Sequence, residues 1–164
     1  MKKQKGFTLI EILVVIAIIG ILATIVLVSL QETKNKGRIA RAQSDIRSIR
    51  TALVILEDNS VEWPGHWKVD IVDSGAGGNE VWDLGSTAGG IVQTDGSFPN
   101  WKGPYINGNF PKDPWGNDYF FDPDYDLNPS GTSRWSVVIG SFGPNGVGQN
   151  VFDSDNIIEI MAIE

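Results

Sequence analysis

The sequence predicts an α+β protein in which one long N-terminal α-helix packs on a small antiparallel β-sheet head. An uncharged apolar run covers residues 12–30, and a stripe of apolar residues at helical spacing continues over residues 39–56. Residues 59–164 instead contain short apolar segments separated by stretches rich in glycine, asparagine and aspartate. The first two patterns are typical of a helix and the third is typical of strands and turns.

The first thirty residues have the composition of a membrane-inserted segment. Three lysines precede an apolar stretch from Phe7 to Leu30 that contains a single charge. A helix of this length reaches about 36 Å, enough to cross a hydrocarbon core of about 30 Å, and it is longer than the core of a cleaved secretory signal. The positive-inside rule places the lysines in the cytoplasm. We therefore expect a single-pass protein of the cytoplasmic (inner) membrane with its C-terminal part outside the cytoplasm.

Glu11 is the unusual residue of this stretch. An ionisable group at membrane depth costs about 3 kcal/mol on insertion scales, and such a group needs a partner. A plain membrane anchor accounts for the length of the stretch and for the lysines but leaves Glu11 unexplained. Glu11 is therefore the first candidate functional residue.

Residues 6–11, which read Gly-Phe-Thr-Leu-Ile-Glu, follow basic residues and open the apolar helix. This pattern resembles the processing site of type IV pilins and of the pseudopilins of type II secretion. The resemblance implies that a prepilin peptidase removes the leader, residues 1–6, by cutting between Gly6 and Phe7, and that the new amine of Phe7 is methylated. It also implies that Glu11 pairs with this amine on a neighbouring subunit during assembly. Opposite charges attract strongly in a low-dielectric medium, so the pair would set the register between apolar helices.

The helix is expected to continue past the assembly segment, residues 7–30, to about residue 58. Apolar residues recur there at spacings of three and four, which is the pattern of one helix face. The charged residues fall off this face, and Asn59, Pro64 and Gly65 are expected to end the helix. Residues 31–58 are therefore predicted to be an amphipathic half that packs on the head. The stripe consists of Ile39, Ala42, Ile46, Ile49, Leu53 and Leu56.

Residues 59–164 are predicted to form the globular head with a C-terminal loop. All six tryptophans lie here, and the segments 135–139, 157–163 and 119–121 are candidate strands. Residues 70–98 are rich in glycine and weakly patterned, so we expect a long loop region. About 105 residues suffice for a modest domain whose core the stripe of the helix completes.

Charge and cysteine content restrict the function. The chain has 13 basic and 20 acidic residues, and removing the leader with its three lysines leaves 10 basic against 20 acidic. This balance argues against direct binding of nucleic acid, which relies on basic patches. The chain has no cysteine. Thiolate metal sites and cysteine catalysis are therefore excluded, and no disulfide closes the C-terminal loops.

Two further segments resemble the major, G-type pseudopilin of type II secretion: residues 101–105, Trp-Lys-Gly-Pro-Tyr, and residues 110–119, Phe-Pro-Lys-Asp-Pro-Trp-Gly-Asn-Asp-Tyr. The resemblance implies the pilin fold and a structural subunit of a pseudopilus, a helical filament that drives protein export. It also implies partners: further copies of the chain, the prepilin peptidase, minor pseudopilins and an inner-membrane assembly platform.

Residues 141–157 resemble the C-terminal calcium loop of the same family, in which a glycine-rich turn precedes an acidic cluster and a last strand. Calcium takes six to eight oxygen ligands from carboxylates and backbone carbonyls in such loops. The resemblance implies Ca²⁺ as a ligand, with Asn145, Asp153 and Asp155 as the side chains that bind it. Asn145 stands where the family usually has aspartate, and the loss of a carboxylate is expected to weaken the affinity. The alternative is a set of ordinary solvated turns.

Three other polar features receive structural interpretations. Residues 122–128 imitate the start of an EF-hand, but Leu127 occupies the glycine position, so we expect a loop with Asx turns. His66, which is the only histidine, is expected at the surface. The Lys-Asp-Pro-Trp-Gly block at residues 112–116 is expected to set a turn rather than to catalyse a reaction.

The sequence leaves two alternatives to the pseudopilus subunit. The first is a type IV pilin that forms a surface fibre for adhesion, motility or DNA uptake, because both families share the N-terminal half. The second is an enzyme with a membrane anchor, for which we find no catalytic residues; the chain is not expected to be an enzyme. The family often has a proline at the position of Val28. Since proline breaks helices, we expect either a more continuous helix in the filament here or unwinding that is guided only by Gly20 and the β-branched residues.

Overall fold

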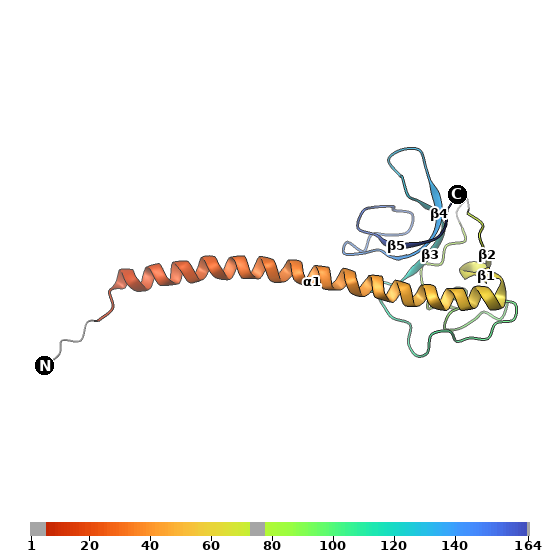
Figure 1. The fold of residues 1–164 in the computed structure, drawn as a ribbon, viewed down its shortest axis with the longest axis horizontal. Helices are drawn as coiled ribbons and strands as arrows, with labels where there is room; N and C mark the ends of the chain where they lie inside the picture. The colour runs from red at the N-terminus through yellow and green to blue at the C-terminus, as the bar shows by residue number, and fades with distance from the viewer. Residues whose placement is uncertain (1–5, 73–77, 164) are drawn as a thin grey trace. The chain divides into compact units, whose positions relative to one another are not determined.

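The computed structural model describes residues 6–72 and 78–163 (Figure 1). Contacts divide the chain into two units at Gly37. The order of elements is α1 (Leu9–Ser60), β1 (Glu62–Trp63), the 3₁₀ turn η1 (Pro64–His66), β2 (Trp67–Lys68), the 3₁₀ turn η2 (Thr87–Gly89), β3 (Phe120–Asp126), β4 (Trp135–Ser141) and β5 (Ile157–Ile163).

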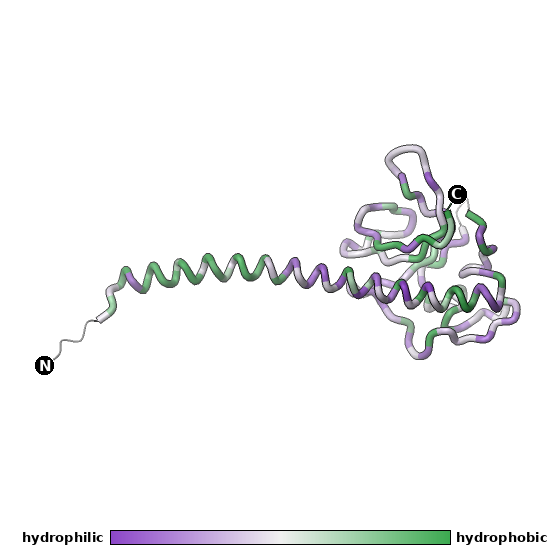
Figure 2. Tube along the Cα trace, in the orientation of Figure 1, coloured by the Kyte–Doolittle hydropathy of each residue, from purple (hydrophilic) through white to green (hydrophobic). Residues whose placement is uncertain are grey.

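Residues 9–30 of α1 are predominantly apolar, and α1 is exposed from Leu9 to Lys36. Figure 2 shows the predominance of hydrophobic residues in this part and the mixture of hydrophobic and hydrophilic residues that follows. The helix contains a stretch that is long enough and apolar enough to cross a membrane. α1 begins two residues after the expected Phe7 and ends two residues after the expected residue 58. It is continuous through Val28 in the single chain, whereas our expectation concerns the filament and stays a prediction.

The second part of α1 supplies one side of the core of the head. The predicted stripe is buried from Ala42 to Leu56, while Ile39 at its start is only half-buried. Complete burial of a leucine stabilises a fold by about 2 kcal/mol, so the stripe is a major term in the stability of the head. Its partners in the core are Trp63, Val81, Leu84, Ile91, Phe98, Tyr119, Phe121, Val137 and Ile139.

The main sheet is antiparallel with the order β3-β4-β5 (Figure 1). The predicted strand at residues 157–163 coincides with β5. The predicted strand at residues 135–139 corresponds to β4, which extends two residues further. Side chains alternate between the faces. Phe121 and Ile139 therefore face the core with α1, while Phe120 and Val138 belong to a second cluster on the opposite face.

The expectation of a loop at residues 122–128 is wrong for most of the segment. Asp122 to Asp126 belong to β3, pair with β4 and are buried. The ladder shifts its register between Asp122 and Tyr125, which accommodates Pro123. The Asx-type bond is nevertheless present, since the N–H of Asp124 donates to Asp122 Oδ1 at 3.0 Å. Tertiary pairing overrides the low strand propensity of aspartate and proline here.

Residues 70–72 and 78–98 form no extended strand, as expected, although they bury several core side chains. Val81 forms an isolated bridge with Phe121, and η2 is a single turn. Residues 73–77 of the predicted loop lie outside the described residues. The hairpin of β1 and β2 was not expected, because strands of two residues carry no periodic pattern.

We predict that Val61→Gly stabilises the head. Val61 follows α1 with a φ of 57°, and its N–H donates to the carbonyl of Glu57 at 2.8 Å. Glycine usually occupies this left-handed position, and a β-branched residue is strained there. Val61 is 72% exposed, so little packing is lost. The free energy of unfolding should rise by about 1 kcal/mol, measured by urea denaturation followed by tryptophan fluorescence.

Val54→Gly is the matched control for this substitution, because Val54 is also exposed but lies inside α1. The same change of residue should lower the free energy of unfolding there by about 0.5 kcal/mol, since glycine weakens a helix interior. A loss of stability in both variants would show that Val61 is not strained.

We also predict that the stability of the head falls as pH rises from about 4 to about 8. Burial, together with a hydrogen bond to the side chain of Asp124, raises the pKa of Asp122 to about 8 from an ordinary value of 3.8. Between these values the folded chain holds a proton that the unfolded chain has released, so the free energy of unfolding decreases with pH and levels off above about pH 8.

Asp122→Asn removes this titration, so the variant should have a flatter stability profile and exceed the unchanged chain at pH 8. Urea denaturation at several pH values measures the profile, with the exposed Asp58→Asn as the control. An unchanged slope in Asp122→Asn would contradict the assignment.

Candidate functional site

Glu11 has a partner within its own chain. The backbone N–H and the hydroxyl of Thr8 both donate to Glu11 Oε2, at 2.7 and 2.9 Å, and the N–H of Glu11 donates back to Thr8 Oγ1 at 3.3 Å. This reciprocal arrangement is a capping box, which satisfies backbone donors at the start of a helix. The spacing Thr-x-x-Glu was visible in the sequence but was not recognised there.

The predicted processing site lies directly before the helix. Gly6 and Phe7 are exposed and outside α1, which begins at Leu9. Phe7 is 85% exposed. The peptide bond between them is therefore in irregular, accessible backbone, and the capping residue Thr8 stays with the helix when residues 1–6 are removed.

Two of the three predicted calcium ligands lie in contact. Asn145 Nδ2 donates to Asp153 Oδ2 at 2.8 Å, and the N–H of Val147 donates to Asn145 Oδ1 at 2.8 Å. Asp153 Oδ1 accepts the N–H groups of Asp155 and Asn156 at 3.0 and 3.2 Å. Asn145 and Asp153, which flank residues 146–152 of the loop, are thus joined by a hydrogen bond between their side chains.

Asp155, the third predicted ligand, contacts the start of the loop through its backbone carbonyl. The carbonyl oxygen of Asp155 lies so close to Gly143 that a Cβ at this glycine would collide with it. Within residues 6–72 and 78–163, no group of three or more histidine or acidic side chains is placed to bind one ion. The side chains that meet here are the carboxylate of Asp153 and the amide of Asn145, and oxygen ligands of this kind suit a hard cation such as calcium.

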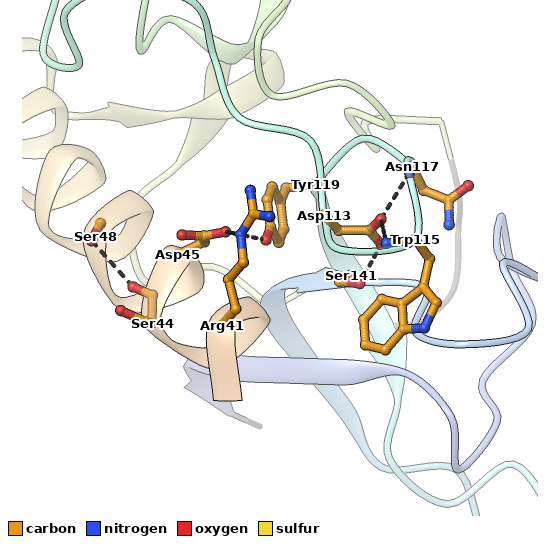
Figure 3. A network of polar contacts seen from close by, with 9 residues as sticks. All are labelled: Arg41, Ser44, Asp45, Ser48, Asp113, Trp115, Asn117, Tyr119 and Ser141. Atoms are coloured by element: carbon orange, nitrogen blue, oxygen red, sulfur yellow. Dashed lines mark hydrogen bonds and ion pairs between the residues drawn. The ribbon is translucent and has the colours of Figure 1, made fainter. Parts of the chain in front are cut away.

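The Lys-Asp-Pro-Trp-Gly block has the structural role that its sequence indicated (Figure 3). Asp113 Oδ1 accepts the N–H groups of Trp115 and Asn117 at 3.0 and 2.8 Å, and Ser141 Oγ donates to Asp113 Oδ2 at 2.6 Å. Ser141 Oγ in turn accepts the N–H of Gly143. Asp113 therefore joins the 112–117 turn to the end of β4 and to the start of the C-terminal loop.

A second polar contact in Figure 3 ties α1 to the head. Tyr119 donates its hydroxyl hydrogen to Asp45 Oδ2 at 2.9 Å, and Arg41 Nε lies 3.6 Å from the same oxygen. Burial and the neighbouring Asp45 raise the pKa of Tyr119, so the hydroxyl remains a donor at physiological pH.

His66 is partly exposed at the surface, as expected, but it also has polar contacts that we did not expect. Its Nδ1 lies 2.8 Å from Glu62 Oε2, its Nε2 lies 2.9 Å from Asp95 Oδ2, and its ring packs on Phe98. The hydrogen bond to Asp95, with a smaller contribution from Glu62, raises the pKa of His66. The two carboxylates contact opposite nitrogens, so the cluster is not arranged around one metal ion. The sequence separation of 29 residues from Asp95 hid this contact.

Comparisons with known proteins connect these features. Residues 1–27 match the prokaryotic N-terminal methylation motif, and residues 88–159 match the type II secretion system protein G family. The type II secretion system core protein G of Vibrio cholerae is 38% identical over 149 residues, which cover 89% of this chain and 86% of that protein.

Two other similarities have a smaller extent or identity. A fimbrial protein of Pseudomonas aeruginosa is 36% identical over 98 residues, which cover 58% of this chain and 57% of that protein. The crystal structure of the major pseudopilin from the type 2 secretion system of enterohaemorrhagic Escherichia coli superposes with a TM-score of 0.49 at 24% identity. The superposition covers 79% of this chain and 87% of that chain.

Proposed function

The chain belongs to the type II secretion system protein G family, and we propose that it is a structural subunit of a pseudopilus, polymerised into a helical filament that drives protein export. The observation that carries this proposal is the match to core protein G over 89% of this chain. A surface fibre of the type IV pilin kind is less well supported, because the similarity to the fimbrial protein covers only 58% of this chain.

The proposed assembly begins in the cytoplasmic membrane. The lysines keep the leader on the cytoplasmic side, and α1 anchors the chain with its head outside the cytoplasm. A prepilin peptidase cuts the exposed bond between Gly6 and Phe7 and methylates the new amine. The processed subunit then leaves the membrane for the filament, guided by minor pseudopilins and an inner-membrane assembly platform.

Glu11 is proposed to have two partners in succession. In the single chain the capping box with Thr8 compensates the carboxylate at the start of α1. Both bonds from Thr8 end on Oε2, which leaves Oε1 for the amine of Phe7 on a neighbouring copy. The carboxylate of Glu11 therefore keeps its hydrogen-bond donors while the subunit is in the membrane. It can still form a strong ion pair when the subunit docks in the filament.

Calcium is proposed as a ligand of the loop at residues 141–157. The support is that Asn145 and Asp153 lie together. A cation between the two side chains requires Asn145 to turn its Oδ1 toward Asp153, which breaks the hydrogen bond from Val147. Bound calcium would neutralise Asp153 and crosslink the loop. Its affinity should be lower than for a loop with two carboxylates.

The first prediction of this proposal concerns the N-terminus. Mass spectrometry of the protein from its own host should find a peptide that begins at methylated Phe7. Glu11→Ala and Glu11→Gln should both be processed at the same bond, and both should assemble into few or no filaments. A mature chain that keeps residues 1–6 in the presence of the peptidase would overturn the proposal.

The pair of variants separates the two roles of Glu11. Glutamine also occurs in capping boxes, so Glu11→Gln keeps the bond from the N–H of Thr8 but has no negative charge. If Glu11→Gln assembles as well as the unchanged chain, the cap is sufficient and the proposed ion pair with Phe7 is wrong.

The second prediction concerns calcium. Millimolar calcium should raise the thermal unfolding midpoint of the head of the unchanged chain slightly and that of Asn145→Asp by several degrees more, because a second carboxylate strengthens the site. Asp153→Asn should remove the response, while the exposed Asp58→Asn should keep it. Equal shifts in the unchanged chain and in Asp153→Asn, or equal shifts with magnesium, would contradict a calcium site here.

A further inference from the structure

A pocket on the head takes no part in the assembly described above. Its volume is about 550 Å³, which lies in the range of small-molecule sites. Three segments surround it: the residues after the bridge at Val81, the 116–118 turn, and the C-terminal loop from Phe142 to Gln149. The side chains that line it are Trp82, Asp83, Asn117, Asp118, Phe142 and Gln149.

One wall of the pocket is aromatic and rigid. The ring centroids of Trp82 and Phe142 lie 6.1 Å apart, and both rings contact Phe120, at 6.0 and 4.6 Å. Phe120 is fully buried in the second apolar cluster of the head. Since the wall is part of the packed core, a ligand that stacks on it would order few additional side chains.

The other side chains that line the pocket are polar, and most of these residues are held in place by hydrogen bonds or an ion pair. Asp118 Oδ1 pairs with Lys112 Nζ at 2.8 Å, and Asp83 Oδ1 accepts the N–H of Gly85 at 2.8 Å. The N–H of Asn117 donates to the buried Asp113. Carboxylate acceptors therefore stand beside amide groups, which both donate and accept.

Glycines allow the C-terminal loop to approach this pocket closely. A Cβ at Gly148 would collide with the ring of Phe142, and Gly146 has a φ of 64° and lies against the side chain of Asn117. These two positions need glycine for steric and conformational reasons. The loop thus forms one side of the pocket without filling it.

We propose that this pocket binds a carbohydrate, with one pyranose ring stacked on Trp82 beside Phe142. A pyranose has an apolar C–H face and a rim of hydroxyl groups, each of which donates and accepts hydrogen bonds. The rim would donate to Asp83 and Asp118 and exchange hydrogen bonds with Asn117 and Gln149. Phosphates are disfavoured by the two carboxylates, and a cationic group cannot accept from the amides.

The test uses the full chain in a zwitterionic detergent without a sugar headgroup. Cellobiose and N,N′-diacetylchitobiose are titrated separately and followed by calorimetry and by saturation-transfer NMR. The inference expects saturable binding of at least one disaccharide with a Kd in the millimolar range, about 1–10 mM. Absence of saturation for both disaccharides at about 50 mM, or tighter binding of arginine amide than of either, would overturn it.

Variants locate the binding. Asp83→Ala and Gln149→Ala change exposed side chains and should each weaken binding, Asp83→Ala by about tenfold because it removes a charged acceptor. Trp82→Ala should abolish binding, and its near-UV circular dichroism reports whether the head is still folded. Asp58→Ala and Gln93→Ala, exposed and outside the pocket, are the matched controls. Equal affinity in the unchanged chain, Asp83→Ala and Gln149→Ala would show that the sugar binds elsewhere.

Discussion

The packing of one apolar stripe of α1 on the sheet is the interaction on which the rest of the head depends. The three-stranded sheet is too small to bury its inner face alone, and the helix supplies Ile46, Ile49, Leu53 and Leu56 to complete the core. The contact between Tyr119 and Asp45 adds a specific polar tie at the same interface. The part of α1 from Arg38 onward is therefore one unit with the head.

Aspartate side chains hold the loops of this head, which has no disulfide. Asp113, Asp126 and Asp153 each accept two or more hydrogen bonds, mostly from backbone N–H groups of turns. Hydrogen bonds to charged groups are stronger than those between neutral groups. Part of the acidic composition of the chain is thus structural, and the side chains of the C-terminal loop hold that loop together.

An acidic side chain also has a structural role at the N-terminus. Glu11 serves as the capping residue of α1 in the single chain and is proposed to be an ion-pair partner in the filament. A helix start in lipid has unsatisfied N–H groups that only the protein can satisfy. The carboxylate of Glu11 accepts a hydrogen bond from one such N–H group, and its negative charge is still free for the proposed ion pair in the filament.

The local pattern of the sequence determined the long helix, its buried stripe, the last two strands and the processing motif, because these depend on the periodicity or order of neighbouring residues. Tertiary structure alone decided what depends on residues far apart. Asp122 to Asp126 form a buried strand because β4 offers a ladder to pair with, and His66 has a second carboxylate partner because Asp95 approaches it from another loop. The pocket at Trp82 and Phe142 has the same origin, since three separate segments must meet to form it. Such contacts between distant segments cannot be predicted from the spacing of residues in the sequence, because they depend on the packing of the core.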